Sequence, residues 1–158
     1  NPKYPRGLDT VKIFGFNYRM SEMQGAVGLA QIKKLNLILK ENKYRYKALE
    51  NLVSKRFKIR EKIKFNEPSY DTFMFEVENS QNRKKIINYL KKNGIGTKNI
   101  PDAIKWHFAT YWKHAVSKFQ INSIKKSHKK IKNYIAIPVL LKKNVAIYKK
   151  IGNFIKDI

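Results

Sequence analysis

An amide and a guanidinium two residues apart mark the segment of this sequence best suited to holding a ligand. Asn17 and Arg19 flank Tyr18 in "GFNYRMSEMQGAVGLAQIKKLN", residues 15–36. Ser21 stands three residues before Gln24, which is the spacing of a capping box and predicts a helix that begins directly after it. An amide and a guanidinium beside the N–H groups of a helix N-terminus suit a phosphate group. The alternative is a surface loop in which Asn17 forms a turn and Arg19 is solvated.

A second candidate segment is "WHFATYWKH", residues 106–114. On a helix, Trp106 and Trp112 would share one face, and so would His107 and His114. Aromatic side chains with a few polar tips suit a sugar or a base ring. The two histidines alone do not predict a zinc site, because no third ligand stands at a suitable spacing. The alternative is that the aromatic residues fill a core and His107 is an internal hydrogen-bonding group.

Other catalytic patterns are absent from the sequence. There is no cysteine, which excludes disulfides and thiolate metal sites. The sequence also lacks a glycine-rich phosphate loop, a nucleophilic serine elbow and a convincing pair of catalytic carboxylates. We therefore predict no metal site and no catalytic residue within these 158 residues.

Composition narrows the class of protein. A hydrophobic content of 42% predicts a folded core, and the length suits one domain or one part of a larger one. The net charge of +24 comes from lysines spread along the chain together with much Ile and Asn, a pattern that an AT-biased coding sequence also produces. We therefore expect a solvated basic surface and no specific nucleic-acid partner. No apolar run is long enough for a membrane span and no signal peptide is recognisable, so we expect a cytoplasmic location.

Periodicity predicts a long helix followed by a small α+β domain. The helix is expected over residues 22–56, and Gly25 and Gly28 in its first turns indicate close approach of another backbone or, alternatively, a weak helix start. Gly94 is expected in the left-handed conformation that ends a helix. Two or three short strands are expected, with helices on one side of them. The remaining predicted elements are a short strand within 10–16, strands within 70–78 and from Ile95, a helix from Asn79 or Ser80 to 92, a loop or broken helix over 98–120, a helix over 123–132, a strand over 134–140 and a helix over 144–155.

These segments resemble one known family. "GFNYRMSEMQGAVGLAQIKKLN" is similar to the G-x-N-Y-R-M-S-E-x-Q-A-A-x-G-x-x-Q-L-x-x-L segment of the sugar aminotransferases of the DegT/DnrJ/EryC1/StrS family. "NGIGT", "IPDAIKWH" and "YIAIPVLLKKN" resemble later family segments, in the same order. The resemblance spans the chain but covers only the C-terminal part of the family's architecture, which is fold-type I with a pyridoxal 5'-phosphate cofactor. It implies that residues 1–56 end the large domain and connect it to a small α+β domain over 57–158.

The resemblance also implies roles for individual residues. Asn17 matches the asparagine that reaches across a dimer interface to the cofactor phosphate, and Arg19 matches the arginine that lines the same composite site. His107 matches the histidine of the P-x-x-L-H segment, and with Tyr18 and Trp106 it is expected to bind substrate. The small residues after Ser21 fall where the helix packs closely in the large domain.

The resemblance predicts a keto-sugar substrate, with Glu or Gln as the amino donor. The sugar is expected to be nucleotide-linked or Kdo-type and to serve the biosynthesis of polysaccharide or lipopolysaccharide. "AIKWHFATYWKH" is more aromatic than the family's usual segment, which leaves the sugar open.

The family's Schiff-base lysine and the aspartate that pairs with the pyridinium nitrogen have no counterpart here. The chain is therefore expected to be inactive alone and to act as a homodimer or with a partner that carries the N-terminal half. A noncatalytic partner subunit or relic is one alternative, and a basic nucleic-acid-binding protein is another.

Overall fold

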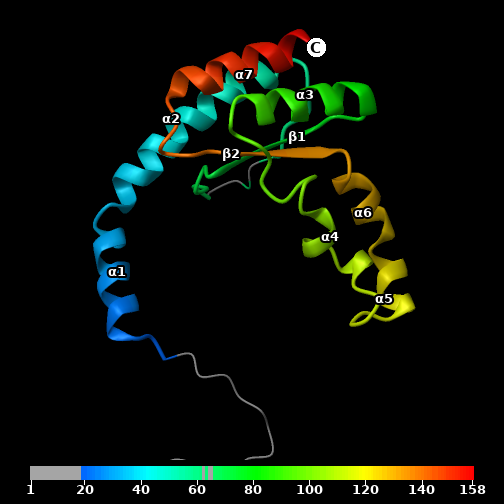
Figure 1. The fold of residues 1–158 in the computed structure, drawn as a ribbon, viewed down its shortest axis with the longest axis horizontal. Coiled ribbons are helices and arrows are strands. Elements are labelled where there is room, and N and C mark those ends of the chain that lie inside the picture. Colours follow the sequence, from blue (N-terminus) through cyan, green and yellow to red (C-terminus); the bar gives the residue numbers. More distant parts are fainter. Residues whose placement is uncertain (1–18, 62, 64–65) are drawn as a thin grey trace, which may run out of the picture. The chain divides into compact units, whose positions relative to one another are not determined.

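The computed structural model describes residues 19–61, 63 and 66–158 (Figure 1). The chain separates into two compact units, the first ending at Leu35 and the second covering Asn36–Ile158. The strand expected within residues 10–16 lies outside the described residues. The helices and strands are α1 (Glu22–Ile32), α2 (Leu35–Val53), β1 (Thr72–Glu76), α3 (Ser80–Lys92), α4 (Ile104–His107), the 3-10 helix η1 (Ala109–Tyr111), α5 (Lys118–Ser123), α6 (Lys125–Ile131), β2 (Tyr134–Pro138) and α7 (Val145–Asp157).

The centre of the second unit is an antiparallel pair of strands, β1 and β2. Phe73 lies opposite Ile137 and Phe75 opposite Ile135, and all four side chains are fully buried. The alternation of apolar residues along β1 produces this buried face, because successive side chains of a strand point to opposite sides. The mixed α/β class predicted from the sequence is confirmed.

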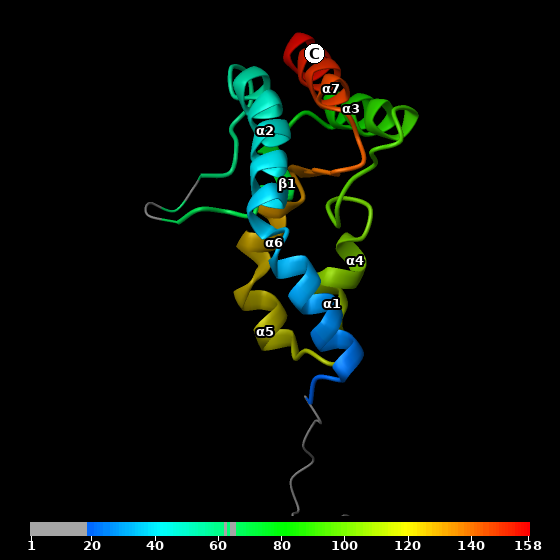
Figure 2. The ribbon, with the colours of Figure 1, turned by 90° about the vertical axis from the view of Figure 1, so that its left-hand side faces the viewer.

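Three helices cover the buried face of the strands. In both views α3 and α7 lie together over this face (Figures 1 and 2), and residues of α2 complete the core. The contributing side chains recur at helical spacing because a helix that covers a sheet buries one stripe of its surface. The buried apolar side chains of these helices are Tyr46, Leu49, Val53, Ile86, Leu90, Tyr148, Ile151 and Ile155.

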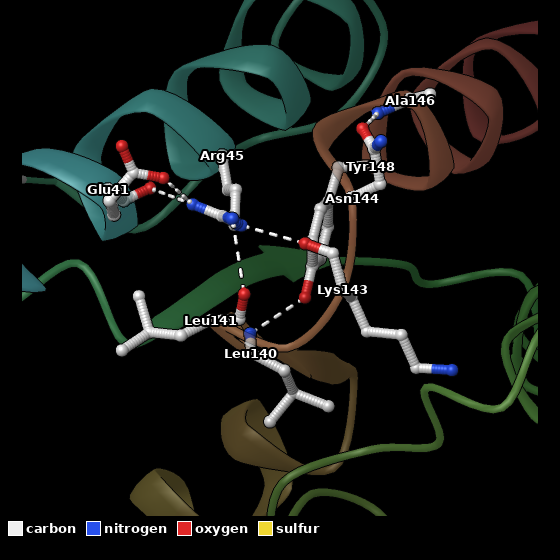
Figure 3. Close-up of polar contacts among 8 residues, drawn as sticks. All are labelled: Glu41, Arg45, Leu140, Leu141, Lys143, Asn144, Ala146 and Tyr148. Carbon is white, nitrogen blue, oxygen red and sulfur yellow. Dashed lines mark hydrogen bonds and ion pairs between the residues drawn. The ribbon is translucent and has the colours of Figure 1, made fainter.

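Polar contacts tie α2 to the segment between β2 and α7 (Figure 3). The Arg45 guanidinium donates to the backbone carbonyls of Lys143 at 2.9 Å and Leu141 at 3.2 Å, and it pairs with Glu41 at 2.6 Å. The buried Tyr148 hydroxyl accepts from the Leu140 backbone N–H at 2.7 Å. A segment with no regular structure thus has its backbone groups satisfied by side chains of the neighbouring helices.

The prediction of one continuous helix over residues 22–56 is wrong. It is divided into α1 and α2 by a turn at Lys33 and Lys34, where the Lys34 N–H donates to the Gln31 carbonyl at 3.0 Å, three residues back. This shorter step tightens the last turn of α1 and ends the regular ladder. The helix predicted over 123–132 is confirmed as α6, and the separate short helix α5 precedes it.

Other local predictions are confirmed. Asn79 caps α3, Gly94 has a positive φ of 64°, and α7 begins where the last helix was expected, with Asn144 as its cap. The strand predicted from Ile95 is wrong, because β2 pairs within the described sheet only with β1 and residues 95–97 form no strand. A third segment does approach the sheet, through an isolated antiparallel bridge from Ile59 to Phe75. The domain boundary at residue 56 stays a prediction.

Candidate functional site

The candidate phosphate-binding segment lies at the start of α1. Asn17 and Tyr18 lie outside the described residues, and Arg19 is exposed. The predicted capping box is confirmed: the Ser21 hydroxyl accepts from the Gln24 backbone N–H at 3.3 Å, and the Gln24 amide accepts from the Ser21 N–H at 2.9 Å. The cap satisfies the N–H groups of Ser21 and Gln24 and thereby fixes the start of α1 directly after the motif.

The apolar side chains of α1 are exposed. None of its residues is buried, and Met23, for example, is 78% exposed. A Cβ added to Gly28 would have no described heavy atom within 4 Å. The close approach of another backbone at Gly25 and Gly28 stays a prediction.

The aromatic segment does not form the single helix that would align its tryptophans and histidines. The helix α4 ends at His107, and the 3-10 helix η1 follows before Trp112. Trp106 is 82% exposed and His107 is exposed, so the alternative that both lie in a core is wrong. Both side chains are open to a ligand.

Sequence reasoning missed a histidine that the aromatic segment contacts. His128 in α6 stacks on Phe108 with ring centroids 5.8 Å apart and meets the Tyr111 ring edge-on at 5.0 Å. Burial against these rings, and to a lesser extent the charge of Lys132, lowers the pKa of His128. These ring contacts of His128 pack the aromatic segment against α6.

The structure also assembles a charged pair that the spacing of residues does not reveal. Asp71 and Lys98 are 27 positions apart, and their side chains form an ion pair at 2.6 Å. They line a cavity of about 580 Å³ together with Tyr46, Arg60, Tyr70 and Asn99. No metal-binding group of three His, Asp or Glu residues exists among residues 19–61, 63 and 66–158.

Comparison with known proteins assigns the chain to a family. Residues 5–153 match the model of the DegT/DnrJ/EryC1/StrS aminotransferase family. This range covers nearly the whole sequence, including the "GFNYRMSEMQG" motif. The chain therefore belongs to this family of pyridoxal-phosphate-dependent aminotransferases, which confirms the resemblance.

Solved structures share the fold. The PMP form of the putative sugar aminotransferase Spr1654 from Streptococcus pneumoniae is 18% identical, with a TM-score of 0.66, over 87% of this chain and 35% of that one. Helicobacter pylori PseC, an aminotransferase of pseudoaminic acid biosynthesis, is 18% identical with a TM-score of 0.60, over 93% and 39%. The synthase of 3-amino-5-hydroxybenzoic acid is 18% identical with a TM-score of 0.66, over 99% of this chain and 43% of that one. The chain thus spans well under half the length of these relatives.

The described residues do not by themselves fit the whole cofactor. Pyridoxal phosphate needs a lysine at its aldehyde carbon and an acidic group at the ring nitrogen, which lies on the opposite side of the ring. Lys98 is the lysine among the described residues that line this cavity, and it contacts Asp71, one of three acidic residues there, directly at 2.6 Å. A pair this close cannot hold both ends of the ring.

No described helix has the length and apolar character needed to span a bilayer.

Proposed function

We propose that the chain is the C-terminal portion of an aminotransferase that transfers an amino group to a keto sugar. The observation that carries this proposal is the family match over residues 5–153, which contains the dense motif around Asn17. The cofactor is pyridoxal 5'-phosphate, as throughout the family.

The motif residues are proposed to complete a cofactor site. Asn17 binds the cofactor phosphate of a neighbouring subunit, and Arg19 lines the same composite site. The exposed position of Arg19 directly before α1 supports this role, since a residue that serves a neighbour has to face outward. Tyr18, Trp106 and His107 are proposed to bind the substrate, and the exposure of Trp106 and His107 is consistent with it.

The 158 residues are proposed to be inactive on their own. The lysine and acidic partner that the chemistry requires would come from the N-terminal portion of the enzyme. The exposed apolar side chains of α1, including Met23, Val27 and Ile32, support association with that portion, within a homodimer or with a separate partner chain.

The substrate is proposed to be a nucleotide-linked or Kdo-type keto sugar, and the amino donor Glu or Gln. PseC, one of the structures that share the fold, acts in the biosynthesis of pseudoaminic acid, which supports a sugar acceptor. A role in polysaccharide or lipopolysaccharide synthesis in the cytoplasm follows from this substrate class.

A reconstitution experiment tests the proposal. The purified chain is incubated with pyridoxal phosphate, Glu and a nucleotide-linked keto sugar, alone and with the N-terminal portion of a family member. We expect amino transfer only in the mixture. Asn17→Ala should weaken cofactor retention by the mixture, whereas the matched variant Asn51→Ala, at an exposed amide of α2, should leave it unchanged.

Two results would contradict the proposal. Turnover by the chain alone, with a borohydride-trapped adduct on one defined lysine, would show that it needs no second portion. A stable complex with the N-terminal portion but no turnover would favour a noncatalytic partner subunit, an alternative that the exposed apolar residues of α1 also support.

A further inference from the structure

The cavity beside Asp71 lies on the face of the strands opposite the one that α3 and α7 cover. Thr72 and Met74 line it and alternate along β1 with the buried Phe73 and Phe75, and Ala136 of β2, which pairs with Met74, lines it as well. Its volume is about 580 Å³, which is in the range of small-molecule sites. The side walls come from the segments that precede β1 and follow α3.

The carboxylate in this cavity is held in a fixed position. Asp71 accepts hydrogen bonds from the hydroxyls of Ser69 and Thr72, each at 3.1 Å, and from Lys98 at 2.6 Å. Its backbone carbonyl accepts from the Val139 N–H at 2.9 Å. The hydrogen bond from Lys98 is the main cause that lowers the pKa of Asp71, so the group is a charged acceptor.

The backbone of Lys98 is held from the other wall. The Lys98 backbone N–H donates to the Ala136 carbonyl at 2.8 Å, and the Ala136 N–H donates to the Ile100 carbonyl at 3.1 Å. The segment that carries the ammonium is therefore attached to the edge of β2. A pair whose two backbones are both fixed to the sheet is preorganised for a ligand.

Two residues with unfavourable backbone conformations stand next to this pair. Tyr70, directly before Asp71, has φ of 54°, and Asn99, directly after Lys98, has φ of 65°. Both line the cavity. Left-handed conformations of residues other than glycine are uncommon, a bulky tyrosine especially so, and they concentrate at ligand sites where the surroundings enforce them.

The pair retains hydrogen-bonding capacity that faces the cavity. Both side chains are about half exposed, at 50% for Asp71 and 42% for Lys98. A carboxylate has about four acceptor positions and an ammonium has three donors, so the bonds described leave about one acceptor and two donors unused. A ligand group that donates to Asp71 and accepts from Lys98 would use these positions, and a hydroxyl can do both.

The described lining of the cavity carries charges of both signs. Among the described residues, Arg60 and Lys98 are its cationic side chains, and Glu61, Glu67 and Asp71 are its acidic ones. The balance of these charges is close to neutral, and the largely buried rings of Tyr46 and Tyr70 form part of the wall. Aromatic walls with a few fixed polar groups are typical of sites for neutral sugars.

We propose that this cavity binds a neutral, polyhydroxylated ring, with Asp71 accepting from one hydroxyl and Lys98 donating to its neighbour. The ligand class is a monosaccharide or a similar vicinal diol. The inference concerns binding alone, so it does not depend on the proposed amino transfer, and a sugar bound here need not be the amino acceptor.

Titration of the full chain with sugars, followed by backbone amide NMR shifts, tests the proposal. The probes are D-glucose, D-galactose and D-mannose, with cyclohexanol as a ring bearing one hydroxyl and inorganic phosphate as an anion. We expect at least one sugar to produce saturable shifts at Asp71, Thr72, Lys98 and Asn99, and neither comparison probe to do so. If no sugar shifts these amides, or if phosphate shifts them more strongly, the proposal is wrong, whatever the outcome of the amino-transfer experiment.

Variants sharpen the result. Asp71→Asn and Lys98→Met should each weaken sugar binding about tenfold or more, because each removes a charged hydrogen-bonding partner. Asp102→Asn is the matched control, since Asp102 pairs with Lys91 at 3.6 Å outside the cavity. Equal weakening by all three variants would show a general effect of charge and would overturn the proposal. The titration of the unaltered chain decides the matter if a variant fails to fold.

Discussion

The helices α1 and α7 are similar in length and differ in what holds them. Both begin with a side-chain cap, Ser21 in α1 and Asn144 in α7. No residue of α1 is buried, whereas α7 buries residues that include Tyr148 and Ile151 in the core of the second unit. Capping determines where a helix begins, and tertiary packing supplies most of its stability. The helix α1 therefore has an apolar surface that is exposed, while α7 is already part of a closed core.

The largest expected difference between the two regions is in the cost of losing an apolar side chain. Phe73→Ala should lower the free energy of unfolding by about 3–5 kcal/mol, because Phe73 is fully buried and packs edge-on against Tyr46 at 5.1 Å. Val27→Ala on α1 should change it by less than about 0.5 kcal/mol, since Val27 is exposed. Urea unfolding followed by circular dichroism measures both. An equal loss in the two variants would show that α1 is packed in the isolated chain.

Replacing a helical glycine by alanine should change stability in opposite directions in the two regions. A Cβ at Gly152 in α7 would lie 2.7 Å from Leu52 Cδ1, so Gly152→Ala should destabilise the second unit by about 1–3 kcal/mol. Gly28→Ala meets no described atom and should stabilise α1 by up to about 1 kcal/mol, the difference in helix propensity. Thermal unfolding and helix content distinguish the two. If Gly28→Ala stabilises the chain alone but weakens the reconstituted enzyme, the close approach predicted at α1 occurs there.

Loss of one hydrogen bond should lower global stability in the second unit and only local stability in α1. Tyr148→Phe should cost about 1–3 kcal/mol of global stability, because it leaves the Leu140 N–H, now bonded at 2.7 Å, without its partner (Figure 3). Ser21→Ala should remove about 1 kcal/mol from α1 locally and leave the unfolding of the second unit unchanged. Amide hydrogen exchange separates local opening from global unfolding. A global loss from Ser21→Ala would contradict the separation of the two regions.

The smallest expected effect is the pH dependence at Asp71. Its pKa is lowered from the usual 3.8, chiefly by the hydrogen bond from Lys98, so the pair contributes stability above 3.8 that is lost as the pH falls through the lowered pKa. Because both side chains are about half exposed, Asp71→Asn should cost less than about 1 kcal/mol near neutral pH. Urea unfolding across the acid range should show the variant and the unaltered chain converging at low pH. A gap that persists below the lowered pKa would contradict the assignment to this carboxylate.

Much of the fold could be predicted because its signals are local. The capping residues Ser21, Asn79 and Asn144 bond to N–H groups two or three positions along the chain, and Gly94 ends α3 through its own backbone conformation. The continuity of the helix over 22–56 was not predictable in this way. No proline or glycine marks the turn at Lys33 and Lys34, and the boundary between the compact units falls beside it, after Leu35.

The candidate sites also differ in whether their residues are neighbours in the sequence. The motif around Asn17 was recognisable because its residues are contiguous, and the family match confirms the resemblance it suggested. The contacts of His128 with Phe108 and Tyr111 were not recognisable, since about twenty residues, which include α5, separate the rings in the sequence.

The sequence by itself therefore determined the family, the helix starts and the alternation that buries one face of β1, because each depends on neighbours along the chain. Only the tertiary structure decided that Asp71 and Lys98 form one pair in one cavity. The two residues meet because antiparallel pairing of β1 with β2 and hydrogen bonds along the edge of β2 bring their backbones together. No pattern of residue types over a gap of 27 positions encodes that meeting, since it is a consequence of strand register and loop path.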